Sequence, residues 1–332
     1  MDSRKRFKRG DIISSKTVRY SLERRIEVSR FGCVFEVLND SDKPFAMKIE
    51  WKDERRPNPK LGMEISVLRN MRQATVSPHF VDFIDQCTKL NFYFMVSTLV
   101  DSNLEQIMKE MKQRISHRTA LAVGIQVVGA LRDLHTLGYV HRDLRPSNLC
   151  PGLGKRSSNI FVVNLGRASM YRKENKIRKP REKAPIRGTL PFISLQTHSH
   201  VEQSAKDDVE CLLYTIVYLC NGLPWKGKSS EIVMAQKKKL RDDSSNFFRK
   251  LAPSTMKSLI AYLDKLDYYA PVDYDYIKQK FIEVASLEKM GGLHANFDWE
   301  HPSRSRSESG SNSISSEESP PISEADSQEF LK

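Results

Sequence analysis

Residues 141–148 constrain the fold of this chain more than any other stretch of its sequence. They read His-Arg-Asp-Leu-Arg-Pro-Ser-Asn, which places an aspartate and an asparagine five residues apart. The carboxylate of Asp143 can accept a proton from a hydroxyl group, and the amide oxygen of Asn148 can bind a magnesium ion. Residues 121–134 are apolar on nearly all sides and predict a buried helix that stops at Gly138, just before this segment. The pattern therefore predicts a polar, chemically active loop that follows a buried helix.

The parts of the chain before and after this loop differ in their hydrophobic periodicity. Up to about residue 99, short apolar runs alternate with turn residues and predict strands, and apolar spacing predicts one helix over 61–71. From about residue 104 onward helical patterns dominate, and residues 209–220 predict a second buried helix. We therefore expect an α+β fold with a small strand-rich part and a larger helical part. The expected strands are 34–38, 45–49, 92–99 and, after the loop, 160–163.

The charge of the chain is strongly positive and unevenly distributed. The formal net charge is +13, and the Ser-rich end has an excess of acidic residues, so the rest of the chain is more basic still. Such a body attracts acidic proteins, phosphorylated segments or other polyanions, although dispersed, solvated lysines and arginines give the same total. Positive charge is the one feature of the sequence that favours nucleic-acid binding. No recognition motif accompanies it, so we do not expect a nucleic-acid binder.

Composition also bears on location and on domain boundaries. No apolar run reaches the roughly 18 residues that span a bilayer, and no signal peptide follows Met1, so no membrane association is expected. The five cysteines are scattered and odd in number, which favours reduced packing cysteines over a disulfide framework or a zinc site. We expect an intracellular protein, in the cytoplasm or, because of its basic start, in the nucleus. Residues 1–17 are expected to form a basic disordered arm, and residues 301–332 a Ser-rich disordered tail.

Seven short phrases form a specific combination along the chain: MEISVL at 63–68, HRDLRPSN at 141–148, RGT at 187–189, DDVE at 207–210, LPW at 223–225, LDY at 266–268 and FDWE at 297–300. This combination resembles the casein kinase 1 superfamily of protein kinases, and within it the tau-tubulin kinases. As in that family, no Ala-Pro-Glu triplet follows the activation loop, and Ser194 and His198 stand there instead. The resemblance covers residues 18–300 and implies a bilobal protein kinase fold, with a β-rich N-lobe at about 18–100 and a helical C-lobe at about 101–300.

The resemblance implies roles for residues on both sides of a cleft between these lobes. Lys48, in Ala-Met-Lys-Ile, matches the strand lysine that contacts the α- and β-phosphates of ATP, and Glu64 matches the glutamate that orients it. Asp143 matches the base that accepts the proton of a substrate hydroxyl, and Asn148 matches a magnesium ligand. Taken singly, Lys48 could be a solvated strand lysine and Asp143 a turn former. Arg145 stands where most kinases have a lysine that touches the γ-phosphate, and its guanidinium is larger and forked.

The loop expected to cover the phosphates departs from the family pattern. It should read G-x-G-x-x-G so that backbone amides can approach the phosphates closely, but residues 27–32 keep only the last glycine, Gly32. The side chains of Glu27 and Ser29 limit that approach, and an inward Glu27 would repel the nucleotide. Arg30 could compensate for the charge of Glu27. We expect Gly32 still to contact the nucleotide, through a loop that fits it less closely.

The second departure concerns the metal. Asn164 occupies the aspartate position of the Asp-Phe-Gly triplet, and the chain reads Asn-Leu-Gly there. Asparagine keeps an oxygen but lacks the negative charge of a carboxylate, and magnesium prefers carboxylate oxygen. We therefore expect Asn148 and Asn164 to form a weakened metal site. The alternative is that Glu64, Asn148 or a neighbouring acid takes over part of the coordination.

Three further positions follow from the resemblance. Ser97 is expected at the gatekeeper position behind the adenine pocket, with Leu99 in the hinge that follows it. Leu190 stands where the family often has an arginine that holds acidic or phosphorylated substrate residues, although the basic run at 172–187 could still attract them. Asp208 is an N-cap by position, and it matches the family aspartate that braces the catalytic loop.

Two functions remain open at the level of sequence. The first is a monomeric serine/threonine protein kinase that uses ATP and Mg²⁺ to phosphorylate acidic or phosphorylated proteins, which Lys48, Glu64, Asp143 and Asn148 favour. The second is a pseudokinase that serves as a basic docking or scaffolding module, which Asn164 and the glycine-poor loop favour.

Overall fold

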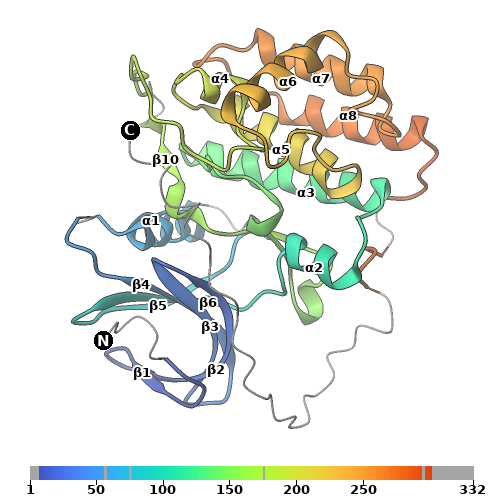
Figure 1. The fold of residues 1–332 in the computed structure, drawn as a ribbon. Helices are drawn as coiled ribbons and strands as arrows, with labels where there is room; N and C mark the ends of the chain where they lie inside the picture. Colours follow the sequence, from blue (N-terminus) through green and yellow to red (C-terminus); the bar gives the residue numbers. More distant parts are fainter. Residues whose placement is uncertain (1–6, 56–57, 75–76, 175, 294–295, 301–332) are drawn as a thin grey trace. The chain divides into compact units, whose positions relative to one another are not determined.

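The N-lobe is a six-stranded antiparallel sheet in the order β1-β2-β3-β4-β6-β5 (Figure 1). The computed structural model describes residues 7–55, 58–74, 77–174, 176–293 and 296–300. Alternate residues of the strands face one apolar core, as the two-residue period of a strand requires; Phe35 and Val37 of β3 are both buried. The strands are β1 (Ile12–Ser14), β2 (Arg19–Ser29), β3 (Gly32–Asn39), β4 (Pro44–Trp51), β5 (Phe83–Thr88) and β6 (Phe92–Thr98).

The predicted hairpin of the N-lobe is confirmed. Strands β3 and β4 include the expected runs 34–38 and 45–49 and pair in antiparallel register. Asn39 closes the turn between them, because its side-chain oxygen accepts hydrogen bonds from the backbone N–H groups of Ser41 (3.0 Å) and Lys43 (2.9 Å). The run expected at 92–99 corresponds to β6, and the predicted helix is α1 (Lys60–Ala74).

The ordered sheet begins earlier in the chain than the sequence indicated. Strand β1 lies within the segment expected to be a disordered arm. It pairs with β2, and its Ile13 is buried. Phe7 packs on the same core, with its ring stacked on that of Trp51 at 5.6 Å. These apolar side chains stabilise an ordered conformation despite the basic residues around them. The rest of the expected arm, residues 1–6, and the expected tail, 301–332, lie outside the described residues.

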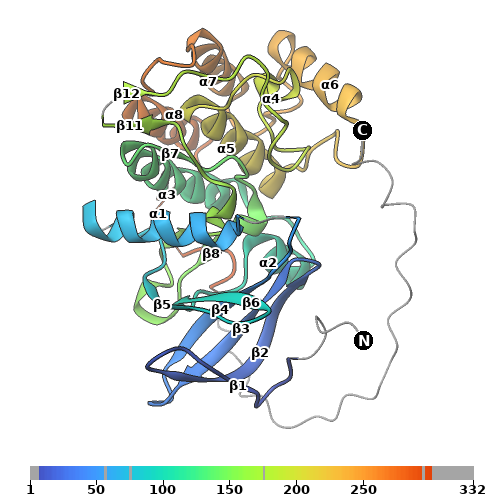
Figure 2. The ribbon, with the colours of Figure 1, turned by 90° about the vertical axis from the view of Figure 1, so that its left-hand side faces the viewer.

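The C-lobe is helical, and α1 lies between the sheet and its helices (Figure 2). Helices α3 and α5 pack on each other at its centre and coincide with the two predicted buried helices. Every residue of α5 except Lys206 is buried. The helices are α2 (Leu104–Met111), α3 (His117–Thr136), α4 (Leu195–His198), α5 (Ala205–Cys220), α6 (Ser230–Asp242), α7 (Pro253–Lys265) and α8 (Tyr274–Leu287).

Short strands and 3-10 turns carry the loops that face the N-lobe. Strand β9 corresponds to the strand expected at 160–163 and pairs with β8, which directly follows the predicted catalytic loop. The strands are β7 (Tyr139–Val140), β8 (Leu149–Pro151), β9 (Ile160–Val162), β10 (Ser169–Met170), β11 (Arg172–Lys173) and β12 (Lys176–Ile177). The 3-10 turns are η2 (Pro146–Asn148), η3 (Gly154–Arg156) and η4 (Leu165–Arg167).

The start of α5 corrects one prediction. Ser204 is the N-cap of this helix, and the carboxylate of Asp207 accepts a hydrogen bond from the Ser204 backbone N–H at 2.8 Å. Asp208 lies within the first turn, so the prediction that it is the N-cap was wrong. The sequence position did not identify the N-cap, because three residues that can cap a helix, Ser204, Asp207 and Asp208, lie close together there.

All five cysteines are free thiols, and four of them are buried among apolar side chains, as expected for packing residues. Burial raises the pKa of Cys33 to about 11, which keeps its thiol protonated. Within the described ranges, no helix combines the length and the apolar character needed to cross a bilayer.

Candidate active site

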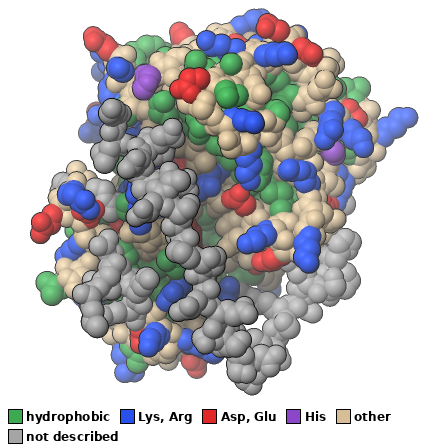
Figure 3. Space-filling view, in the orientation of Figure 1, with side chains coloured by type: hydrophobic (Ala, Val, Ile, Leu, Met, Phe, Trp, Pro, Cys, Tyr) green, Lys and Arg blue, Asp and Glu red, His purple; other side chains and the backbone are tan. Residues whose placement is uncertain are grey.

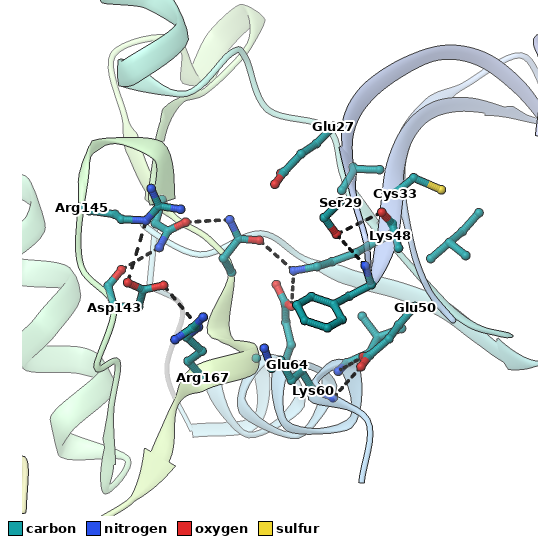
Figure 4. Close-up of a pocket in the computed structure, with 18 residues that line it drawn as sticks. Glu27, Ser29, Cys33, Lys48, Glu50, Lys60, Glu64, Asp143, Arg145 and Arg167 are labelled. Carbon is teal, nitrogen blue, oxygen red and sulfur yellow. Dashed lines mark hydrogen bonds and ion pairs between the residues drawn. The ribbon is translucent and has the colours of Figure 1, made fainter. Parts of the chain in front are cut away.

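A cavity of about 210 Å³ lies between the sheet and the C-lobe, and seven of the predicted site residues line it (Figure 4). Strands β2 to β4 and helix α1 supply one side, while the loop before β8 and the segment around η4 supply the other. The seven residues are Gly32, Lys48, Glu64, Asp143, Arg145, Asn148 and Asn164.

The predicted pair of Lys48 and Glu64 is formed. Lys48 lies in β4, flanked by β3 and β6, and its Nζ lies 2.6 Å from Oε2 of Glu64 in α1. Glu64 is 4% exposed although it is charged, and such burial is tolerated because the lysine is its partner. The ion pair fixes the ammonium group at the wall of the cavity, where it can meet an anionic ligand.

Asp208 fixes the backbone at the start of the loop at 141–148. The two carboxylate oxygens of this buried residue accept hydrogen bonds from the backbone N–H groups of His141 (2.6 Å) and Arg142 (2.8 Å). The ring of His135 in α3 lies 2.9 Å from the same carboxylate. Burial alone would raise the pKa of Asp208, but these hydrogen bonds and the nearby histidines lower it below its usual value. The carboxylate is therefore ionised and braces the loop, as predicted.

Asp143 is surrounded by three donors. Its Oδ1 accepts a hydrogen bond from the hydroxyl of Thr189 at 2.7 Å. The Nε atoms of Arg145 and Arg167 lie 3.8 and 3.5 Å from its carboxylate oxygens, one arginine on each side (Figure 4). Arg145 and Arg167 thus place two cations beside the carboxylate, and the Thr189 hydroxyl fills one of its acceptor positions.

The predicted metal ligands bind protein groups instead. Asn164 adopts a left-handed backbone conformation (φ 63°), which asparagine tolerates better than most residues. Its side-chain oxygen accepts a hydrogen bond from Lys48 Nζ at 2.7 Å, and its Nδ2 donates to the side-chain oxygen of Asn148, also at 2.7 Å. Each amide oxygen thus accepts one hydrogen bond from a protein donor, and neither carries the negative charge that magnesium prefers. No group of three or more His, Cys, Asp or Glu residues within the described part of the chain could hold a metal ion. The residues present do not fit a magnesium ion.

The glycine-poor loop is closed by its own serine. The hydroxyl of Ser29 accepts a hydrogen bond from the backbone N–H of Phe31 and donates one to the carbonyl of Gly32, both at 3.2 Å. A Cβ at Gly32 would lie 1.9 Å from the carbonyl oxygen of Ile49, so only glycine fits there. The side chain of Glu27 is directed into the cavity (Figure 4).

Arg30 does not compensate for Glu27. Its guanidinium lies over the ring of Phe31, 4.5 Å from the centroid, and Arg30 is absent from the cavity wall. Within this tight turn Arg30 can contact either the carboxylate of Glu27 or the ring of Phe31. The sequence did not predict which of the two contacts forms.

Ser97 and Leu99 are the predicted site residues that do not line this cavity. Both are buried, and the hydroxyl of Ser97 is directed to the carbonyl of Thr98 at 3.5 Å. Leu190 likewise contributes its carbonyl oxygen to the buried ammonium of Lys237, at 3.4 Å, rather than a side chain to a ligand.

Two partners of Asp143 were missed, Arg167, which lines the cavity, and Thr189. Arg167 follows the Asn-Leu-Gly triplet directly, and Thr189 belongs to the Arg-Gly-Thr phrase. Their proximity to Asp143 arises from tertiary packing, so the available signal was limited to their position next to motifs. The sequence left two interpretations of Arg142, a partner for a phosphate in the activation loop or a packing residue; its guanidinium donates to the carbonyls of Arg167 (2.8 Å) and Ala168 (3.4 Å).

Comparison with known proteins supports this arrangement of lobes and loop. A family model described as "Protein kinase domain" matches residues 20–270. "Putative serine/threonine-protein kinase ZK507.1" of Caenorhabditis elegans is 30% identical over 250 residues, which cover 74% of this chain and 75% of that protein. "Putative serine/threonine-protein kinase K06H7.1" of the same organism is 27% identical over 292 residues, which cover 86% of this chain and 81% of that protein.

Proposed function

Because the chain belongs to the protein kinase family, we propose that it transfers the γ-phosphoryl group of ATP to serine or threonine hydroxyls of proteins. The observation that carries the proposal is the Lys48–Glu64 ion pair at 2.6 Å, formed across the cavity from Asp143. In kinases this pair must be in place for the phosphates to be positioned. The names of the two nematode relatives support serine and threonine as acceptors.

Asp143 supplies the acid–base part of the reaction. A substrate hydroxyl that takes the place of the Thr189 hydroxyl would donate its hydrogen bond to Oδ1 of Asp143. Its oxygen forms a bond to the γ-phosphorus, the bond from that phosphorus to the β,γ-bridging oxygen breaks, and the hydroxyl proton passes to the Asp143 carboxylate. The brace from Asp208 holds the loop during this transfer, since it fixes the backbone of two residues next to Asp143.

The preferred substrates are acidic or phosphorylated proteins. Lys and Arg side chains are spread over the visible face of the C-lobe rather than gathered into one patch (Figure 3). The segment after η4 adds a basic hairpin, β11 and β12, whose Arg172 contacts the end of α3. Such a field favours the approach of anionic segments without selecting a sequence. Among its cations, Arg181 is already paired with Glu202, so the remaining ones carry the attraction.

We place the chain in the casein kinase 1 superfamily, close to the tau-tubulin kinases. The support comes from the Ser194 to His198 segment that stands in place of an Ala-Pro-Glu triplet. The Ser194 hydroxyl donates to the buried Asp207 carboxylate at 2.5 Å, and His198 Nε2 lies 3.3 Å from Lys237 Nζ. These contacts tie the end of the activation segment to α5 and α6 without the glutamate that other kinases use.

A transfer assay tests the proposed activity. The full chain is incubated with γ-labelled ATP and an acidic protein substrate, with Mg²⁺, with Mn²⁺ and with EDTA, beside the Asp143→Asn variant. We expect label in the substrate with the unaltered protein and a loss of about 10²–10⁴-fold in the variant. Equal labelling by the two proteins would exclude phosphoryl transfer by this site.

One observation favours the second candidate, a pseudokinase that binds partners without turnover. The hydrogen bond from Asn164 Nδ2 to Asn148 engages the oxygen that would otherwise bind the metal. In that case the assay gives no label above the Asp143→Asn background, and the Asp143→Asn change leaves the capture of an acidic protein partner unaltered.

A further inference from the structure

The carboxylates of the cavity are almost all engaged by protein groups. Four acids line it: Glu27, Glu50, Glu64 and Asp143. Glu50 accepts hydrogen bonds from the first two backbone N–H groups of α1, at 3.1 and 2.7 Å. Glu64 binds Lys48 at 2.6 Å, and Asp143 accepts a hydroxyl hydrogen bond between two arginines. A divalent cation would have to displace one of these partners, since it prefers carboxylate oxygens and loses its water reluctantly.

The amide side chains close the remaining route to a metal. The oxygen of Asn164 accepts from Lys48, and the oxygen of Asn148 accepts from the Asn164 amide group, each at 2.7 Å. An amide N–H₂ group in the position of a metal ion presents hydrogen atoms to Asn148, where a metal would present positive charge. The site thus already satisfies its oxygens with donors from the chain.

Four cationic side chains, Lys48, Lys60, Arg145 and Arg167, line the cavity as well. Arg145 and Arg167 share the carboxylate of Asp143 at 3.8 and 3.5 Å, and Arg145 also lies 3.9 Å from Glu105. Nε of Arg145 is nevertheless buried and has no hydrogen-bond partner within the described part of the chain. A buried guanidinium N–H without an acceptor is costly, and the planar fork of arginine matches the oxygens of a phosphate group.

We propose that this cavity binds the triphosphate of ATP as the free anion, without a divalent cation, and that Arg145 and Arg167 supply the charge that a metal would otherwise bring. The inference rests on the nucleotide of the proposed function, but it concerns binding rather than transfer. Magnesium lowers the affinity in this scheme for two reasons. It cancels part of the negative charge that the arginines recognise, and three of the four carboxylates of the cavity already have protein partners.

Titration calorimetry with the full chain tests this proposal. ATP is titrated in EDTA and again in excess MgCl₂, and inorganic tripolyphosphate in EDTA serves as the probe without a base or sugar. We expect binding of both anions in EDTA, and an ATP affinity at least about fivefold higher in EDTA than in MgCl₂, an effect equivalent to one ordinary hydrogen bond. Binding that requires Mg²⁺, or no binding under any of these conditions, would overturn the proposal.

A matched pair of arginine variants locates the effect. Arg167→Gln removes one charge-assisted contact and should weaken ATP binding in EDTA about tenfold. Arg156→Gln is the control: its side chain is also 40% exposed and also lies 3.5 Å from an aspartate, Asp82, but it is outside the cavity. Glu27→Gln should strengthen binding of the free anion, because it removes a like charge from the cavity wall. An Arg167→Gln protein with unaltered affinity would contradict the assignment.

The outcome is separable from that of the transfer assay. Binding in EDTA without labelled product leaves this inference standing and removes phosphoryl transfer. Labelled product with strictly Mg²⁺-dependent binding does the reverse, since it keeps the kinase proposal and removes the metal-free site.

Discussion

The charged side chains of the C-lobe interior and those of the cavity between the lobes differ in burial and in their hydrogen-bond partners. Around α5, Asp208 and Glu210 are 1% and 5% exposed, and each has several hydrogen-bond partners from other elements. In the cavity, the side chains of Arg145 and Arg167 are 31% and 40% exposed; they share the carboxylate of Asp143, and Arg145 also lies 3.9 Å from Glu105. The hydrogen bonds of the first region are completed by the chain itself, whereas in the second Nε of Arg145 is buried without a hydrogen-bond partner among the described residues.

This difference separates the positioning of the catalytic loop from the chemistry of the phosphates. Asp208 fixes the backbone next to Asp143 without contact with the cavity. Asn164 alters the metal position without contact with Asp208. The loop can therefore keep its geometry while the neighbouring segment before η4 presents an amide at Asn164 in place of a carboxylate. Each of the following changes acts on one of the two regions and leaves the other in place.

The largest effect is expected from Asp208→Ala. The change leaves two buried backbone N–H groups without an acceptor and removes the partner of His135, so we expect a loss of about 3–5 kcal/mol in the free energy of unfolding. Urea denaturation at neutral pH measures it. Asp242→Ala, an exposed aspartate of α6, is the control and should cost less than about 0.5 kcal/mol. A loss below about 1 kcal/mol for Asp208→Ala would mean that the interior network is not the rigid region.

Asn164→Asp should come next and acts on the cavity alone. A carboxylate cannot donate to Asn148, so it frees the oxygen of that residue and adds the missing negative charge. We expect the rate of phosphoryl transfer with Mg²⁺ to rise by about 10²–10³-fold, with ATP affinity shifted in favour of Mg²⁺. Steady-state labelling measures the rate, and Asn91→Asp, exposed before β6, controls for net charge. A rate that stays the same or falls shows that the account of the metal position is wrong.

Lys237 gives the interior of the C-lobe a pH dependence. Its side chain is fully buried beside His198, Glu210 and Arg241, and burial lowers its pKa to about 7 although Glu210 opposes the shift. Between that value and the ordinary lysine pKa, the unfolded chain binds more protons than the folded chain, so stability rises with pH. We expect a gain of up to about 2 kcal/mol from pH 7 to pH 9.

Urea denaturation at the two pH values checks this gain in the unaltered protein and in Lys237→Met. The variant should lose the gain, whereas Lys238→Met, an exposed neighbour in α6, should keep it. A gain of the same size in Lys237→Met would assign the titration to another group.

The smallest effect is expected from Ser29→Gly. Loss of the serine hydroxyl removes both hydrogen bonds that close the loop, and glycine lets the backbone approach a phosphate. We expect an increase of about fivefold in ATP affinity, measured by calorimetry, with no change in unfolding midpoint beyond that of Ser41→Gly in the β3–β4 turn. Unchanged or weaker binding would indicate that the closed loop already has the shape the ligand needs.

The sequence predicted the fold because its periodicities agree with the final packing. The apolar runs that became β3, β4, α3 and α5 are buried in the finished structure, and the brace from Asp208 was expected from its family match. Strand β1 was missed because it has three residues and little apolar pattern of its own, and it is stabilised by pairing with β2.

The site was predicted as a set of positions but not as a set of contacts. Lys48 and Glu64 meet as expected because strand and helix geometry leaves them few alternatives. The hydrogen bond between Asn164 and Asn148 depends on the rotation of two amide groups, which neighbours distant in sequence decide. The same holds for Arg167 and Thr189, whose approach to Asp143 follows from the path of the chain after β9.

The hydrogen bond from Lys48 to Asn164 links the two lobes. It joins β4 to the segment around η4, and through Asn148 the network continues to the carbonyl of Asp143. Rotation of the Asn164 amide group would therefore break one contact to each lobe at once.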